Sequence, residues 1–187
     1  MTGLLTVCEP EAPAYAGAIA VEPLAPGDAE TVQRVFDGLG ARSRELRFLT
    51  AKPRLTERDL RVLSDVDGRD RVALVARHDG CPIGIARIVR DDADPTSADV
   101  AIEVVDSWQD RWVGTRLAHA LVDRAQELGI TRFTIAMAQD NEPALRLLHR
   151  VADRVTRVAF GNGSVDFVAT VGSTSSRPNA VLKGLRT

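Results

Sequence analysis

A short loop between a strand-like run and an amphipathic helix holds the residues best placed to do chemistry. The run DVAIEVV, residues 99–105, is apolar and β-branched, and QDRWVGTRLAHAL, residues 109–121, passes into helical periodicity. Gly114 and two arginines, Arg111 and Arg116, lie early in this segment. A strand, a turn and a helix start in this order are the layout of a phosphate-binding site, because free backbone N–H groups and the helix dipole favour an anion.

Two residues of the loop depart from what a phosphate-binding turn requires. Trp112 stands where a glycine is expected, and Asp110 adds a negative charge. An indole could block the approach of phosphates or force the backbone out of shape, since glycine is used where backbone and ligand come close. Alternatively, both side chains point outward and the backbone groups still reach the ligand. Both arrangements are compatible with the sequence, and the second is the prediction.

Two carboxylates lie in the strand that precedes the loop. Asp99 and Glu103 are four residues apart, so on a strand, whose side chains alternate between faces, both lie on the same face. An otherwise apolar strand has little structural use for either, and carboxylates can act as general bases. The alternative for each is a solvated surface group.

Composition indicates a single globular domain. The chain has 187 residues, 44% hydrophobic and 27% charged, which allows one buried core. A net charge of -2 without a basic block argues against a dedicated nucleic-acid binder. No long apolar run or secretory signal is found, so no membrane association is predicted and a cytoplasmic location is expected. Cys8 and Cys81 lie far apart, outside any metal or redox spacing, and are expected to be reduced thiols; no metal is predicted.

Periodicity and turn residues divide the chain into elements. Residues 18–25 favour a first strand, and helices are predicted within 26–40 and 54–68, the second with Thr56 and Asp59 as a capping box. Further strands are expected at 71–77, 82–90, 99–105, 131–138, 154–160 and 164–170, and further helices within 109–128 and 144–151. The strand–helix–strand unit spanning 99–138 should be a right-handed parallel crossover.

The chain ends differ from this middle part. Residues 1–17 are rich in Ala, Pro and Gly, and residues 171–187 are rich in Ser and Thr. A flexible leader at 1–17, a domain at 18–170 and a flexible tail at 171–187 are therefore predicted.

This order of elements resembles the GNAT superfamily of acyl-CoA-dependent N-acetyltransferases over residues 18–170. Within the family, LRFLTAKPRLTERDL, DVDGRDRVALVA, DVAIEVVDSWQDRWVGTRL and QDNEPALRLL are similar to the bacterial protein-lysine acetyltransferase branch. The resemblance implies an α/β (α+β) GNAT fold: a mixed, mostly antiparallel sheet of six or seven strands, with helices on both faces and a splayed central strand pair.

The resemblance also implies a site for acetyl-CoA. The family turn reads Gln or Arg, two residues, Gly, any residue, then Gly or Ala, which here is Gln109 to Gly114. N–H groups at the helix start would bind the pyrophosphate, and the main chain before the turn would pair with the pantetheine arm. Asn141 fits a further cofactor contact, although Asn before a helix is commonly a cap. The expected cofactor-binding residues are Val104, Val105, Gln109, Asp110, Arg111, Trp112, Val113, Gly114, Thr115, Arg116 and Asn141.

The implied reaction is transfer of the acetyl group to a protein lysine side chain or to a small-molecule amine by direct attack. The amine must lose a proton, since the pKa of lysine in water is about 10.4. In the resembled branch the base is an acidic residue at the position of Asp99, where the shorter Asp favours relay through a water. Glu103 stands where the branch commonly has an apolar residue, and it is expected to be a second acid, an anchor for the substrate amine or a surface group on a half-exposed strand.

Family members often protonate the leaving thiolate with a Tyr on the last helix, which this chain lacks. Leu148 stands near that place, and His149 beside it faces about 100° away on a helix. A thiol with a pKa of about 8.5 leaves without such help. The alternative function is a catalytically degenerate member that acts as an acyl-CoA-binding or regulatory interaction module. A dinucleotide-binding oxidoreductase is not favoured, because no Gly-rich turn follows the first strand. A homodimer is compatible with the sequence.

Overall fold

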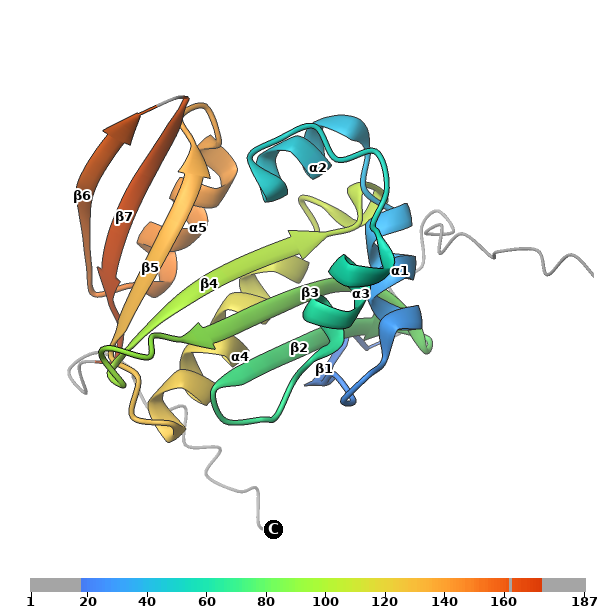
Figure 1. Ribbon diagram of the computed structural model, residues 1–187, viewed down its shortest axis with the longest axis horizontal. Helices are drawn as coiled ribbons and strands as arrows, with labels where there is room; N and C mark the ends of the chain where they lie inside the picture. The colour runs from blue at the N-terminus through green and yellow to red at the C-terminus, as the bar shows by residue number, and fades with distance from the viewer. Residues whose placement is uncertain (1–17, 162, 173–187) are drawn as a thin grey trace, which may run out of the picture.

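A seven-stranded sheet forms the body of the computed structural model, which describes residues 18–161 and 163–172 (Figure 1). The strand order is β1-β2-β3-β4-β5-β7-β6, and β4 and β5 are the parallel pair. The strands are β1 Ala20–Pro23, β2 Arg71–His78, β3 Cys81–Arg90, β4 Ser97–Val104, β5 Arg132–Ala138, β6 Arg154–Gly161 and β7 Ser164–Thr170. The predicted mixed, mostly antiparallel sheet is confirmed.

Helices cover both faces of the sheet, as predicted. One face carries the helices from the first part of the chain, and the other carries α4 and α5 (Figure 1). The α4 helix packs on β2, β3 and β4, and α1 packs on β3 and α3. The helices are α1 Ala29–Asp37, α2 Ala41–Phe48, α3 Glu57–Ser64, α4 Val113–Glu127 and α5 Glu142–Val151, with a 3-10 turn η1 at Asp106–Trp108.

Local signals account for most of these helices. The α3 helix begins at the predicted capping box, in which Thr56 Oγ1 accepts from Asp59 N–H and Asp59 Oδ2 accepts from Thr56 N–H. The predicted inner face of α4 is fully buried at Leu117, Leu121 and Ala125. The left-handed φ of Gly129, 73°, marks the predicted end of that helix.

The α2 helix was not predicted. Between the first strand and the sheet meander the periodicity indicates two helices, and the structure has three. No residue of α2, ARSRELRF, is fully buried, so this helix presents no apolar stripe for a periodicity argument to detect. The ring of Phe48 packs edge-on against Phe36, with ring centroids 5.9 Å apart, and polar contacts described below also hold the helix in place.

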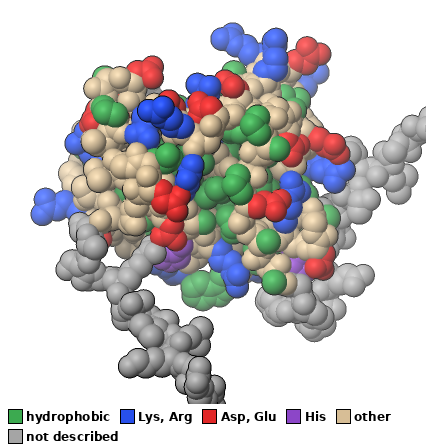
Figure 2. Space-filling view, turned by 90° about the horizontal axis from the view of Figure 1, so that it is seen from below, with side chains coloured by type: hydrophobic (Ala, Val, Ile, Leu, Met, Phe, Trp, Pro, Cys, Tyr) green, Lys and Arg blue, Asp and Glu red, His purple; other side chains and the backbone are tan. Residues whose placement is uncertain are grey.

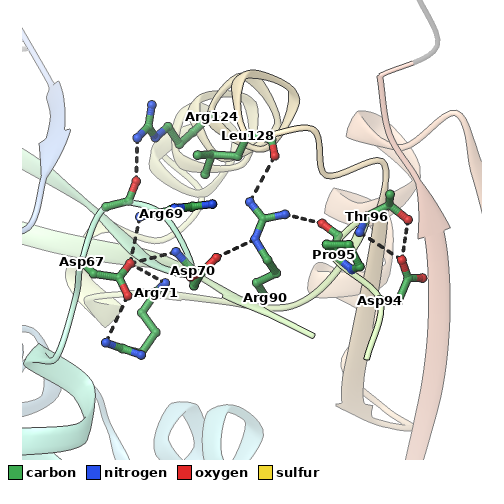
Figure 3. A network of polar contacts seen from close by, with 11 residues as sticks. Asp67, Arg69, Asp70, Arg71, Arg90, Asp94, Pro95, Thr96, Arg124 and Leu128 are labelled. Carbon is green, nitrogen blue, oxygen red and sulfur yellow. Dashed lines mark hydrogen bonds and ion pairs between the residues drawn. The ribbon is translucent and has the colours of Figure 1, made fainter. Parts of the chain in front are cut away.

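A polar network joins the loops at the end of the sheet where β4 begins (Figure 3). Arg90, at the end of β3, donates from Nε to Asp70 Oδ1 at 2.8 Å, from Nη2 to Leu128 C=O at 3.1 Å and from Nη1 to Pro95 C=O. These bonds tie the β2–β3 side of the sheet to the C-terminus of α4 and to the turn before β4. The guanidinium also complements the negative end of the helix dipole.

Replacing Arg90 by Met should destabilise the fold by roughly 1.5–3 kcal/mol, the cost typical of losing hydrogen bonds to charged groups. The side chain is only 15% exposed, so solvent cannot replace these bonds fully. Chemical unfolding at neutral pH measures the change. Arg69→Met, an exposed arginine of the same region, is the matched control and should leave the free energy of unfolding within about 0.5 kcal/mol of the wild type.

Other sequence expectations have mixed outcomes. None of the helices in residues 18–161 and 163–172 has the length and apolarity of a membrane span. On the face shown in Figure 2, acidic and basic side chains are interspersed.

Cys81 is disulfide-bonded, so the prediction of a reduced thiol is wrong for this residue, while Cys8 lies outside the described residues. The predicted leader, 1–17, and all of the predicted tail beyond residue 172 also lie outside them.

Candidate functional site

The two parallel strands at the centre of the sheet separate along their length. Pairing between β4 and β5 covers Ser97 to Asp99 and stops at Asp99 opposite Thr134, although β4 continues to Val104 and β5 to Ala138. The predicted splayed strand pair is therefore confirmed. We call the unpaired parts, residues 100–104 and 135–138, the splay.

Main-chain groups of β4 point into the splay at every second residue. Val105 N–H donates to Ile83 C=O at 3.0 Å, so the polar groups of the odd-numbered residues face β3. Because these groups alternate along a strand, those of Ile102 and Val104 face β5. Val104 thus fits the predicted main-chain contact, whereas the N–H of Val105 is directed away from the splay. Ile102 was missed, and the alternation along the strand would have indicated it.

The side chain of Gln109 joins the loop to its neighbours. Its Nε2 donates to Val104 C=O at 3.2 Å, to Ser43 Oγ on α2 at 3.2 Å and to Asp106 Oδ1 at 3.1 Å. Asp106 Oδ2 in turn accepts from Gly40 N–H at 3.0 Å, just before α2 begins. The start of the loop is therefore fixed to both β4 and α2.

Trp112 and Asp110 both adopt the left-handed conformation. Their φ angles are 66° and 57°. Glycine adopts this region freely, and Asp tolerates it better than most residues, so the backbone takes a shape that glycine usually provides. Asp110 is exposed, and Trp112 is 67% exposed. Both side chains thus lie at the surface, as in the favoured prediction, and neither fills the turn.

The start of α4 leaves backbone donors without helical partners. Arg116 N–H donates to Trp112 C=O at 3.0 Å, which is the first helical bond of α4. The N–H groups of Val113, Gly114 and Thr115 precede it and have no acceptor inside the helix. No acidic residue lies in this first turn, so no side chain there balances the positive end of the helix dipole. The helix start is suited to an anion.

Gly114 is not required by packing within the protein. A Cβ added there would lie 3.6 Å from Leu147 Cδ2 and 3.8 Å from Val104 Cγ2, which are ordinary contacts. A small side chain therefore fits without rearrangement, in agreement with the Gly-or-Ala pattern of the turn. The same distances place Gly114 between α5 and the end of β4.

Three arginines surround this helix start without a carboxylate at ion-pair distance among the described residues. The Arg111 guanidinium lies 5.6 Å from the Trp108 ring, and Arg116 Nη1 donates to Ile19 C=O at 3.4 Å. Arg150, on α5, lies 5.2 Å from the Trp112 ring and donates to Thr115 Oγ1 at 3.4 Å. Arg150 was missed by sequence reasoning, because no local signal connects it to a loop 35 residues earlier.

Residues after β5 have mainly structural contacts. Asn141 Oδ1 accepts from Ala144 N–H at 3.2 Å, so Asn141 is the cap of α5, and a cofactor contact from it stays a prediction. Leu148, near the place expected for a Tyr, is buried in the core. His149 is exposed. Neither residue offers an acid in the splay.

Asp99 and Glu103 lie on one face of β4, as predicted, but in different environments. Asp99 is exposed, at the point where β4 and β5 separate. Partial burial raises the pKa of its carboxyl above the ordinary value, and the negative charge of Asp91 raises it further. A carboxylate that water can reach and whose pKa is raised above its ordinary value is suited to accept a proton.

The Glu103 side chain is only 8% exposed and lies between two arginines. Its Oε2 accepts from Arg47 Nε on α2, and its Oε1 lies 3.7 Å from Arg87 Nε on β3. Burial lowers the pKa of Arg87, and the Glu103 charge opposes that shift. The predicted second acid is therefore enclosed by cations and is not open to solvent like Asp99.

Comparisons with known proteins agree with this geometry. The family model described as Acetyltransferase (GNAT) family matches residues 41–152. Acetyltransferase Pat of Mycolicibacterium smegmatis is 32% identical over 136 residues, which are 70% of this chain and 40% of that protein. The chain thus spans well under half the length of this curated relative.

Solved structures have the same fold. The GNAT domain of S. lividans PAT matches with a TM-score of 0.74 and 26% identity, covering 86% of this chain and all of that one (100%). The structure of yncA from Salmonella typhimurium with its cofactor acetyl-CoA matches with a TM-score of 0.62 over 87% of this chain and 99% of that one. At 16% identity, the second likeness concerns the fold alone.

Proposed function

This chain belongs to the acetyltransferase (GNAT) family, and from that premise we propose that it transfers an acetyl group from acetyl-CoA to an amine by direct attack. One observation carries the proposal: the splay between β4 and β5 leads to a helix start whose first N–H groups have no acceptor within the helix. The extended thioester arm of acetyl-CoA fits the splay, and the phosphates of acetyl-CoA fit the helix start. The match to the family model spans both.

Acetyl-CoA would be held mainly by main-chain groups. The N–H and C=O groups of Ile102 and the N–H of Val104 would pair with the pantetheine arm, and the N–H groups of Val113 to Thr115 would hold the pyrophosphate. Arg111 and Arg150 add positive charge beside these groups. Gln109 keeps the loop in register with β4. No group of three or more His, Cys, Asp or Glu side chains in the described ranges is arranged to hold a metal ion.

Asp99 is proposed as the general base. When bound, acetyl-CoA supplies a thioester carbonyl; the amine nitrogen bonds to its carbon, and the carbon–sulfur bond then breaks. Asp99 accepts the proton of the amine through a water, because its carboxylate is exposed and one methylene shorter than Glu. The thiol, with a pKa of about 8.5, leaves without a protein acid.

The acceptor is proposed to be a protein lysine side chain or a small-molecule amine. Asp99 and the neighbouring face of β4 place the reacting nitrogen, and the elements around it would select the rest of the acceptor. A homodimer and a cytoplasmic location stay predictions.

A degenerate binding module is the second candidate. It is favoured by the non-glycine Trp112 in the loop and by the buried Leu148 near the place of the family Tyr. In that case the protein would bind acyl-CoA without releasing coenzyme A at an enzymatic rate.

Two experiments separate the candidates. Calorimetric titration with acetyl-CoA should give saturable heat, and its absence at millimolar ligand would contradict both functions. Thiol release is then measured with lysine peptides and with a panel of small amines. Acceptor-dependent release supports the transferase, and binding without release from either panel supports the degenerate module.

Replacing Trp112 by Gly should change stability by less than about 1 kcal/mol. Relief of the left-handed conformation gains roughly 1 kcal/mol, and loss of the contact with Arg150 costs about 0.5–1 kcal/mol. Because the indole lies outside the turn, the Kd of acetyl-CoA should change less than about tenfold, or 1.4 kcal/mol. Unfolding and calorimetry measure the two quantities. A much larger gain in affinity would show that the indole obstructs the phosphates.

A further inference from the structure

Three charged side chains form a cluster beneath α2, which we call the Glu103 cluster: Arg47, Arg87 and Glu103. The exposed fractions of the side chains are 16%, 8% and 8%. Glu103 Oε2 accepts from Arg47 Nε, and Oε1 lies 3.7 Å from Arg87 Nε. Both oxygens of Glu103 therefore face cations, so neither is free to take a proton from a substrate or to hold its ammonium group.

The cluster connects four elements. Arg47 comes from α2, Arg87 from β3 and Glu103 from β4, while Arg87 Nη1 donates to Leu63 C=O in the last turn of α3. Arg87 and Arg47 share the single carboxylate of Glu103. The negative end of the α3 dipole compensates part of the Arg87 charge. Arg87 Nε and Nη2 are buried without a hydrogen-bond partner among the described residues. The cluster of two arginines and one glutamate therefore carries a net positive charge, and Glu103 is the carboxylate that holds both cations.

The α2 helix depends on such contacts for its position. It has no fully buried residue, and its links to the rest of the protein include Arg47 to Glu103 on β4, Arg42 to Asp140 after β5, and Ser43 to Gln109. Its two ends thereby reach both sides of the splay. Figure 1 shows α2 near the tips of β4 and β5, on the same face as α1 and α3. Asp99 and Glu103 point toward this face.

We propose that Glu103 is a positioning residue, which through Arg47 fixes α2 across the splay so that α2 forms one wall of the acceptor site. The proposal rests on the acetyltransferase function given above. Glu103 sets where α2 lies, and α2 sets how an amine approaches Asp99. Neither Glu103 nor Arg47 touches the reacting atoms in this arrangement. Changes at these two residues therefore affect the binding of the acceptor.

The informative variant is Arg47→Met, which removes the link while keeping Glu103 paired with Arg87. The KM of the acceptor should rise at least tenfold, while the Kd of acetyl-CoA and the midpoint of the pH profile of kcat stay as in the wild type. Glu45→Gln is the matched control, because Glu45 lies on the same helix in an exposed pair with Arg42 and should leave the KM unchanged. An unchanged KM in Arg47→Met would overturn the proposal.

Glu103→Gln and the double variant separate positioning from direct contact. If Glu103 acts through Arg47, the double variant raises the acceptor KM no more than the larger single change, because both remove one interaction. If Glu103 itself holds the amine, Glu103→Gln raises the KM while Arg47→Met, which frees its oxygen, lowers it. That opposite pair of results would overturn the proposal. Arg47→Met remains decisive if Glu103→Gln does not fold.

Hydrogen exchange gives a readout that does not depend on turnover. Amides of α2 should exchange at least tenfold faster in Arg47→Met than in the wild type, while those of β3 and α4 stay protected. If the protein proves inactive but α2 is loosened, the proposed function fails and the structural link stands. If α2 exchanges as in the wild type, the link itself is refuted.

Discussion

Asp99→Asn should lower kcat by roughly 10²–10⁴-fold, the usual contribution of a general base. Asn has nearly the same shape but cannot accept the proton that the attacking amine must lose. The Kd of acetyl-CoA should stay close to the wild-type value, because Asp99 lies at the point where the splay opens, away from the helix start that is proposed to hold the phosphates. Steady-state kinetics and calorimetry measure the two quantities.

The same residue gives a pH prediction with a defined sign. The folded pKa of Asp99 is raised, first by burial and then by Asp91, so the activity should rise with pH through a midpoint above the ordinary aspartate value. Asp91→Asn removes one cause and should move that midpoint to lower pH, while Asp92→Asn, its exposed neighbour, should not. A midpoint that is the same in Asp99→Asn would remove Asp99 from the proton path.

The contribution of Asp99 to the stability of the fold should change with pH in the direction opposite to the activity. A group whose folded pKa is raised contributes stability below its unfolded pKa, and that contribution is lost as the pH rises through the folded pKa. Ionised Asp99 is therefore slightly unfavourable to folding at neutral pH. Asp99→Asn should melt no lower than the wild type at pH 7, so that a loss of activity cannot be assigned to unfolding.

The sequence predicted the elements that carry local signals. The hairpin strands, the capping box at Thr56 and the buried stripe of α4 follow from alternation, capping chemistry and helical periodicity, and the order of these elements led to the fold. The α2 helix has none of these signals, because polar contacts and the ring of Phe48, rather than a continuous apolar stripe, attach it. A prediction from periodicity cannot detect such a helix.

The site was predictable where it is built from contiguous residues. The loop from Gln109 and the pair Asp99 and Glu103 are adjacent along the chain, so their layout could be inferred. The environment of Glu103 could not, because Arg47 is 56 residues away in sequence and lies on the missed helix. The conformation of Trp112 was open for another reason: whether a bulky residue takes a left-handed φ depends on the surrounding structure.

Thr115→Glu should affect stability and cofactor binding in opposite directions. Thr115 is the third residue of α4, where a carboxylate is favoured by the helix dipole, and it already contacts Arg150. The variant should therefore be more stable by about 0.3–1 kcal/mol. If the N–H groups of this turn hold the pyrophosphate, the same charge repels it, and the Kd of acetyl-CoA should rise on the order of tenfold to a hundredfold, or about 1.4–2.8 kcal/mol.

Thr115→Gln is the matched control, since it has the shape of the Glu variant without its charge. It should bind acetyl-CoA nearly as the wild type does, and the difference between the two variants should shrink as salt screens the repulsion. A purely steric effect would weaken both variants equally and would not depend on salt. If Thr115→Glu is stabilised and still binds acetyl-CoA with the wild-type affinity, the phosphates bind elsewhere. A carboxylate beside the bound pyrophosphate would repel it and weaken binding.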